Sequence, residues 1–148
     1  MKSLDDWFAD YAVCHRHPGN IAIHKVAVPG IYLSVIGLLQ SLPGAPAALG
    51  WGALVAIPAL LFYLRLSFGL FAGMALFTGA GLWGWHTLAT VTPIWPWAVG
   101  LFVLLWIAQF VGHHWEGKRP AFFTDLQFLL IGPLWVLAAI YRRLRLPY

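Results

Sequence analysis

The sequence predicts an all-α integral membrane bundle of four transmembrane helices, with a short amphipathic helix before them and a hydrophobic helix after them. The first observation is composition, since 61% of the 148 residues are hydrophobic and only 9% are charged, against about 25% charged in ordinary soluble domains. The second is charge distribution, because Arg65 is the single Lys, Arg, Asp or Glu between Lys25 and Glu116. The third is that breakers divide this stretch into segments near the roughly 17–25 residues that cross a hydrocarbon core.

The first 25 residues contain charged side chains throughout and no apolar core, so they do not have the pattern of a cleavable signal peptide. Residues 3–14 predict a short amphipathic helix, for which Ser3 or Asp5 is a suitable N-cap. Its aromatic residues would face the membrane or the rest of the protein, and they are Trp7, Phe8 and Tyr11. We expect this helix to lie at the membrane surface.

The apolar segments that follow predict helices, because backbone polar groups in lipid must be paired internally. The four expected spans cover residues 26–42, 51–66, 68–90 and 94–111. A fifth stretch, residues 128–141, is shorter and contains Gly132 and Pro133, which predicts a broken, re-entrant or interfacial helix. We therefore interpret residues 1–148 as one membrane domain: a cytoplasmic N-terminal segment (1–25), four spans (26–112), and a segment with site residues and the last helix (113–148).

The basic residues indicate the orientation of the four spans. The expected loops at residues 43–50 and 91–96 contain no Lys or Arg, so all nine basic residues fall on one side. The positive-inside rule makes that side cytoplasmic and places both termini there, while several tryptophans cluster near the opposite ends. The net charge of +4 thus marks topology and does not indicate nucleic-acid binding. The single cysteine, Cys14, excludes an intramolecular disulfide and leaves a filler role, a lone ligand or a nucleophile.

Five of the six histidines occur in two short groups that this topology brings to the cytoplasmic side. One group precedes the first span and the other follows the fourth, and their members are His15, His17, His24, His113 and His114. The sixth, His86, would lie roughly 27 Å away along the third span, at 1.5 Å per residue. We expect the two groups to meet and His86 to stay apart, near the tryptophan-rich interface.

Helix spacing separates candidate ligands from bystanders. If Pro18 begins a helix, Asn20 and His24 share one face at i and i+4, and His113 and Glu116 share another at i and i+3. We predict a metal site held by His15, His24, His113 and Glu116, with Glu116 and Asn20 as the catalytic set. Imidazole and carboxylate ligands suit iron, zinc or manganese, and two histidines with one carboxylate are typical of non-haem Fe(II) oxygenases.

Other interpretations of these residues stay open at this stage. The histidines can be polar interface residues without a metal, and Glu116 can pair with Lys118 or Arg119. His17 and His114 are expected near the site but not as ligands, and Asn20 can orient a ligand or cap backbone groups. The sequence contains no glycine-rich phosphate loop, Gly-x-Ser-x-Gly elbow or His-Glu-x-x-His motif.

Two motifs that bracket the chain resemble the 2-hydroxy fatty acid dioxygenase family, which includes a fungal endoplasmic-reticulum enzyme and many bacterial membrane relatives. The first motif contains Tyr11, His15, Pro18, Asn20 and His24, followed by Val28-Pro29. The second comprises Gln109-Phe110-Val111-Gly112-His113, Glu116 and Pro120-Ala121, and the run from Phe122 to Trp135 is similar to the bacterial branch.

The resemblance implies an Fe(II)-dependent oxygenase that shortens long-chain 2-hydroxy fatty acids by one carbon with O2, in lipid metabolism. It implies His15, His24 and His113 as iron ligands, Glu116 as a fourth ligand or site carboxylate, and a bacterial inner membrane as the location. The tail would lie in the bilayer among apolar side chains, with basic residues attracting the headgroup. The alternatives are a metal-dependent lipid hydrolase and a non-catalytic protein that binds lipid or supports membrane assembly.

Overall fold

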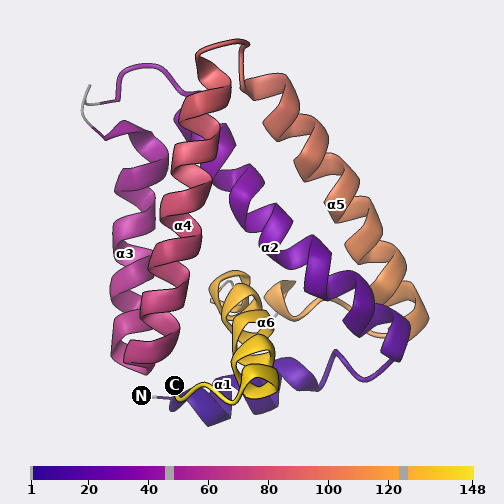
Figure 1. The fold of residues 1–148 in the computed structure, drawn as a ribbon. Coiled ribbons are helices and arrows are strands. Elements are labelled where there is room, and N and C mark those ends of the chain that lie inside the picture. Colours follow the sequence, from indigo (N-terminus) through magenta and orange to yellow (C-terminus); the bar gives the residue numbers. More distant parts are fainter. Residues whose placement is uncertain (1, 46–48, 124–126) are drawn as a thin grey trace.

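A computed structural model describes residues 2–45, 49–123 and 127–148 and confirms the predicted all-α fold class. Four long helices form a bundle: α2 (Pro18–Gln40), α3 (Gly50–Leu66), α4 (Phe68–Ala89) and α5 (Trp95–Glu116). The shorter α1 (Leu4–Ala12), the 3-10 turn η1 (Ala121–Phe123) and α6 (Phe128–Leu144) lie toward one end of this bundle, where both chain termini are also found (Figure 1).

Helix α1 begins where the sequence predicts, and Ser3 is its N-cap. The Ser3 side chain accepts a hydrogen bond from the backbone N–H of Asp6, and the Asp6 carboxylate accepts one from the backbone N–H of Ser3. This reciprocal capping box satisfies two N–H groups that the helix itself leaves unpaired. The Ser3 hydroxyl also donates a hydrogen bond to the Asp6 carboxylate, and this bond lowers the pKa of Asp6. Trp7 and Tyr11 on α1 are buried, so this helix faces protein.

Helix α2 begins earlier than the first apolar segment. His17 is its N-cap and Pro18 its first residue, and the helix then continues to Gln40 with Pro29 inside it. The expected division between residues 25 and 26 therefore falls inside one continuous helix. Helix α5 likewise continues to Glu116, so the expected boundary after residue 112 also falls inside a helix. His24, His113 and Glu116 are consequently held by the long helices themselves.

Length and composition make three of these helices candidate membrane spans, namely α2, α4 and α5, while the apolar α3 has 17 residues. Large apolar side chains on their outer surfaces are exposed, including Leu76, Leu104 and Ile107. A soluble bundle would hide such a surface from water, whereas lipid tolerates it. The described chain therefore has the surface of a membrane protein.

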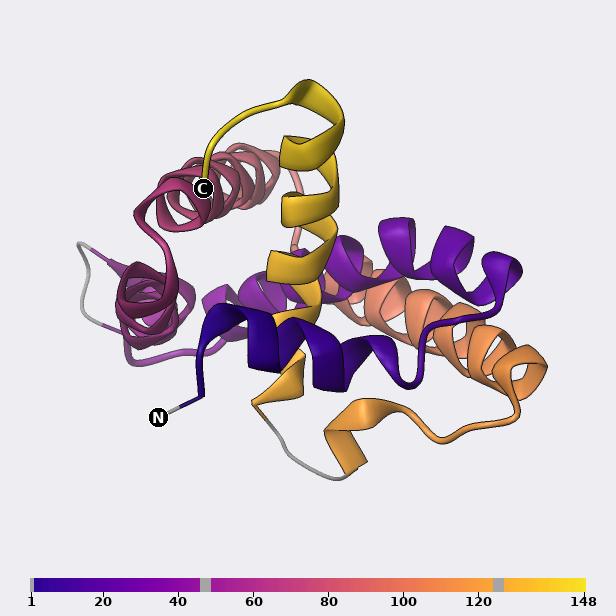
Figure 2. The same cartoon turned by 90° about the horizontal axis from the view of Figure 1, so that it is seen from below.

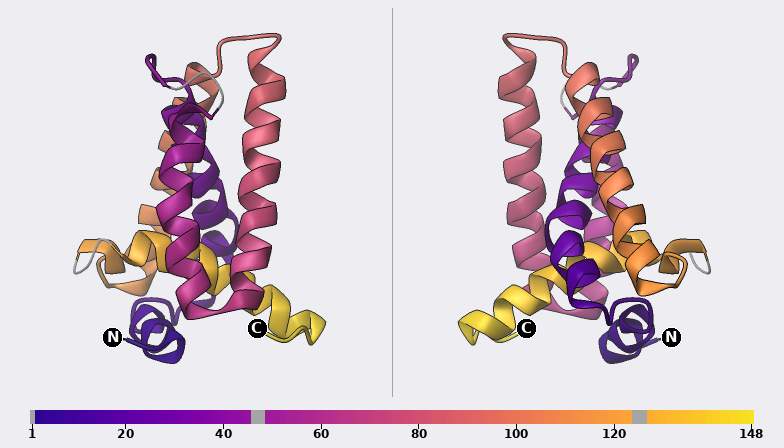
Figure 3. Two further views of the ribbon diagram at one scale, coloured as in Figure 1. Left: turned by 90° about the vertical axis from the view of Figure 1, so that its left-hand side faces the viewer. Right: turned by 90° about the vertical axis from the view of Figure 1, so that its right-hand side faces the viewer.

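Helix α6 crosses the ends of the bundle and continues through Pro133 without a break. Figure 2 shows α6 passing across the bundle near α1, and the side views in Figure 3 place both at the end that carries the termini. The Trp7 ring packs edge-on against Phe128, with ring centroids 5.4 Å apart. At Gly132 an added Cβ would lie 2.9 Å from the Tyr11 hydroxyl oxygen, so the glycine permits this close approach. The N-terminal helix is thus fixed against the C-terminal one.

Candidate metal centre

The short connection from α1 to α2 carries the first histidine of the site. His17 caps α2 by accepting a hydrogen bond at Nδ1 from the backbone N–H of Gly19, and the cap fixes where the helix starts. His15 precedes this cap and is 4% exposed. The His15 ring stacks on Tyr11, with centroids 4.0 Å apart and planes inclined by 14°. Local capping and stacking therefore turn His15 inward.

Three buried histidines converge from separate segments of the chain. His24 lies on α2 and His113 on α5, and both are buried together with His15. The ring centroids are 4.4 Å apart for His15 and His24, 4.8 Å for His24 and His113, and 5.2 Å for His15 and His113. One ring nitrogen from each lies within 4.8 Å of the others. We call these three residues the histidine triad.

Hydrogen bonds at Nδ1 orient two of the triad rings. His15 Nδ1 lies 2.6 Å from the Tyr11 carbonyl oxygen, and His24 Nδ1 lies 2.9 Å from that of Asn20. A neutral imidazole that donates at Nδ1 keeps a lone pair at Nε2, and this is the usual way in which proteins orient metal-binding histidines. Burial lowers the pKa of His15, which favours the neutral form that a metal requires.

The triad fits a metal ion on chemical grounds. The Nε2 atoms of all three histidines are buried and have no hydrogen-bond partner among the described residues. Unpaired buried polar atoms are unfavourable, and a divalent cation would satisfy all three together. Zinc–nitrogen bonds, for example, are about 2.0–2.1 Å long, so the ring nitrogens, which lie within 4.8 Å of one another, would move closer together around a bound ion. Three imidazoles leave further coordination positions for substrate atoms.

Glu116 lies beside the triad, where its carboxylate binds the connection between α1 and α2. It accepts hydrogen bonds from the backbone N–H groups of Arg16, at 2.9 and 3.0 Å, and His17, at 2.7 Å. It also accepts one from Asn20 Nδ2 at 3.0 Å. Lys118, an expected ion-pair partner, instead donates to the carbonyl of Val13. Glu116 is not one of the three residues whose ligand atoms converge, so its predicted role as a ligand stays a prediction.

Asn20 connects the triad to this carboxylate. It is fully buried, its Nδ2 also donates to the Cys14 carbonyl at 3.0 Å, and its backbone carbonyl accepts from His24. Gly112 leaves the necessary space, since an added Cβ there would lie 2.5 Å from Asn20 Oδ1. Asn20 therefore connects α2 to Glu116 on α5 and to the segment just before His15, and its backbone carbonyl orients His24.

The remaining histidines lie outside the triad, as the spacing predicts. His17 caps α2, and His114 is exposed on α5. His86 is in the last turn of α4, and that turn lies at the opposite end of the bundle from α1 (Figure 1). Sequence reasoning missed the stacking of Tyr11 on His15, although the i, i+4 spacing of the two residues was a usable signal.

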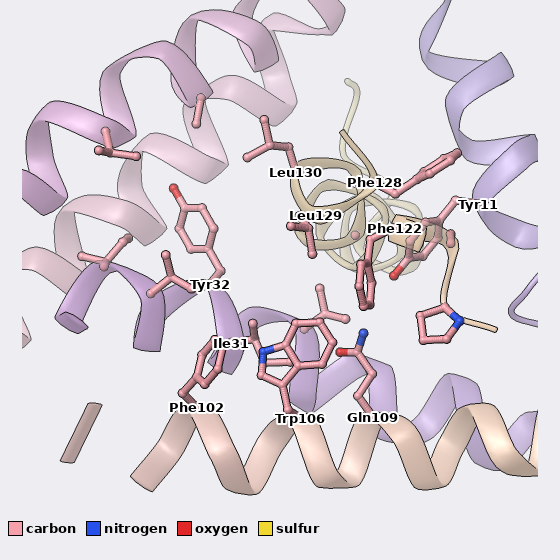
Figure 4. Close-up of a pocket in the computed structure, with 18 of the residues that line it drawn as sticks. Tyr11, Ile31, Tyr32, Phe102, Trp106, Gln109, Phe122, Phe128, Leu129 and Leu130 are labelled. Atoms are coloured by element: carbon pink, nitrogen blue, oxygen red, sulfur yellow. The ribbon is translucent and has the colours of Figure 1, made fainter. Parts of the chain in front are cut away.

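An apolar cavity of about 420 Å³ begins at the triad and continues between α2, α3 and α5. Figure 4 shows its aromatic and aliphatic walls, with Trp106 and Gln109 from α5 facing Phe122, Leu129 and Leu130. His15 and His113 belong to its lining. On α2 the lining extends from Val28 to Leu39, and on α5 from Phe102 to His113, which is about 16 Å of each helix.

The comparisons with known proteins agree with this geometry. A family model described as "2-hydroxy-palmitic acid dioxygenase Mpo1-like" matches residues 1–144. The chain belongs to the Mpo1-like family. It is 31% identical over 132 residues to the 2-hydroxy-palmitic acid dioxygenase MPO1 of Saccharomyces cerevisiae, an alignment that covers 86% of this chain and 73% of the yeast protein. No solved structure matches significantly. The predicted resemblance is confirmed for this Mpo1-like protein, although residues 124–126 of the run from Phe122 to Trp135 lie outside the described residues.

Proposed function

We propose that this Mpo1-like protein is a membrane-embedded, Fe(II)-dependent dioxygenase that shortens long-chain 2-hydroxy fatty acids by one carbon. The observation that carries the proposal is the position of the triad: His15 and His113 line an apolar cavity, and the Nε2 atoms of all three histidines have no hydrogen-bond partner among the described residues. The name of the yeast relative, 2-hydroxy-palmitic acid dioxygenase, supports the substrate class and the use of dioxygen. His15, His24 and His113 would hold the iron, while Asn20 and Glu116 would keep the three histidines in place.

The cavity and the triad would have different roles toward such a substrate. A bound Fe(II) ion would supply the redox chemistry by which dioxygen reacts with a saturated 2-hydroxy acid. The apolar walls would bind the tail and keep water from the reacting carbons. The overall change RCH(OH)COOH + O2 → RCOOH + CO2 + H2O balances: the bond between the first and second carbons breaks, and the second carbon becomes the new carboxyl.

A direct assay tests this proposal. The full-length protein, purified in detergent without oxygen and loaded with Fe(II), is mixed with 2-hydroxypalmitic acid and oxygen, and the products are identified by mass spectrometry. We expect the acid shortened by one carbon, with oxygen consumed. Stoichiometric zinc and no iron-supported oxygen uptake would contradict the proposal and favour the lipid hydrolase. Absence of any bound metal would favour the non-catalytic alternative.

The length of the cavity predicts a preference for long chains. A fully extended chain advances about 3.8 Å per three bonds, so the roughly 16 Å of cavity holds a tail of about 13 bonds. Ala56 lines the cavity on α3 and is buried. We expect Ala56→Phe to shorten the cavity and lower kcat/KM for 2-hydroxypalmitic acid relative to 2-hydroxydecanoic acid by about 10-fold. Ala80→Phe, on an exposed position of α4, is the matched control, and an unchanged ratio in Ala56→Phe would contradict the prediction.

We also propose that all four long helices span a bacterial inner membrane, with both termini in the cytoplasm. The location of both termini at the triad's end of the bundle (Figure 1) and the distribution of Lys and Arg support this orientation. Single cysteines at positions 45 and 93 should react with membrane-impermeant thiol reagents from the periplasmic side of intact cells, after Cys14→Ser removes the native thiol. Labelling only after the cytoplasm is opened would contradict the orientation.

A further inference from the structure

Gln109 is a buried polar residue in the cavity, and it has no role in the chemistry proposed above. Its side chain lines the cavity and is 6% exposed, and its Oε1 has no hydrogen-bond partner among the described residues. In Figure 4 the Gln109 amide points from α5 into the cavity, between Trp106 and Phe122. Leaving such a group unpaired costs about as much as a lost hydrogen bond, so a partner from a bound molecule is expected.

The position of Gln109 along α5 restricts which part of a bound molecule can reach it. Gln109 precedes His113 by four residues, one helical turn or about 6 Å along the axis, and both line the same cavity. If the triad binds the head of an acid, Gln109 lies beside the carbons next to that head. Trp106, whose buried Nε1 also has no hydrogen-bond partner in the described part of the chain, lies one turn further along the tail.

The chemistry of the unpaired atom selects one group of the substrate. Oε1 is an acceptor and needs a donor. An ionised 2-hydroxy fatty acid has one donor, its 2-hydroxyl, and an ordinary fatty acid has none. We propose that Gln109 is the specificity-determining residue that recognises the 2-hydroxyl through its side-chain carbonyl and so rejects fatty acids without it. This inference rests on the proposed function, since it assumes that the triad binds the acid head.

A competing explanation is that Gln109 has a purely structural role, as the hydrogen-bond partner of Trp106. The two residues are three positions apart on one face of α5, so a rotated Gln109 amide could accept from the Trp106 indole N–H. In that case Gln109 would only fix the shape of the cavity wall. Trp106→Phe removes the indole N–H and keeps an aromatic ring, which makes it the control that separates the two roles.

The test measures binding without turnover. The full-length, Fe(II)-loaded protein is titrated under nitrogen with 2-hydroxypalmitate, palmitate and 2-fluoropalmitate, and the Kd values are determined by calorimetry. The wild type should prefer 2-hydroxypalmitate over both analogues. Gln109→Met keeps the length of the side chain without the carbonyl, and it should reduce this preference at least about 5-fold with an unchanged Kd for palmitate. Trp106→Phe should keep the preference of the wild type.

Other outcomes overturn the inference in distinguishable ways. An undiminished preference in Gln109→Met, or the same loss of preference in Trp106→Phe, would remove Gln109 from recognition and leave the proposed function intact. Equal weakening for all three acids in both Gln109→Met and Gln109→Leu would make Gln109 a residue that only shapes the cavity. A wild type that binds none of the acids would instead overturn the proposed function, and the inference with it.

Discussion

His24→Ala and His113→Ala are each expected to abolish stoichiometric metal binding and to lower turnover of 2-hydroxypalmitic acid at least about 100-fold. Even residues that merely orient metal ligands change affinity or activity by 10–100-fold, and these two side chains each bring to the triad a ring nitrogen that has no hydrogen-bond partner in the described part of the chain. Metal content per protein after anaerobic purification, measured by mass spectrometry of the elements, and kcat with added Fe(II) check the expectation.

Two other histidines provide matched controls for this experiment. His86→Ala changes a residue in the last turn of α4, and His114→Ala changes the exposed neighbour of His113. Both variants should retain the metal content of the wild type, because neither ring belongs to the triad. If His24→Ala and His113→Ala also retain their metal, the triad is not a metal site, and the non-catalytic alternative is favoured.

Glu116→Ala is expected to weaken metal binding by about 10–100-fold through release of the connection that carries His15. The wild-type carboxylate accepts backbone hydrogen bonds from Arg16 and His17 and one from Asn20, and hydrogen bonds to charged groups are the stronger ones. Their loss should expose both backbone amides to solvent exchange. Hydrogen–deuterium exchange of the peptide containing Arg16 and His17, together with the Kd for Fe(II), measures both effects.

A graded substitution separates this role from direct ligation of the metal. Glu116→Gln keeps one acceptor oxygen and loses the charge, so its Kd and exchange rate should lie between those of the wild type and Glu116→Ala. Complete loss of metal with unchanged protection of both amides would instead identify Glu116 as a ligand. Lys118→Met, which removes only the bond to the Val13 carbonyl, controls for general loosening of the connection.

The positions of most helices could be predicted, because residues close together in the sequence determine where a helix begins and ends. Apolar segments, breakers and the Ser3 cap indicate where helices lie, although the continuous α2 shows that a polar first turn is easily assigned to a separate segment. The course of α6 through Pro133 was not predictable, because packing against α1, α2 and α4 overrides the local signal of a helix breaker.

The site was predictable to the extent that helix faces define it. His24 and His113 follow from helix spacing, and His15 follows from its proximity to α2. The partners of Glu116 do not follow, because they are backbone groups about 100 positions earlier in the chain, and backbone groups carry no sequence signature. The cavity depends on walls from several helices, so the sequence carries no signal that the motif residue Gln109 lies in its lining.

The fixing of α1 against α6 has a consequence for biosynthesis. The ribosome releases His15 and His24 early, His113 follows only after two further long helices, and the surface of α6 that covers Trp7 and Tyr11 is made after all three histidines. A nascent chain therefore has no complete triad until α5 has been synthesised. If the triad holds a metal as proposed, capture of the ion would have to follow the synthesis of α5, which carries His113.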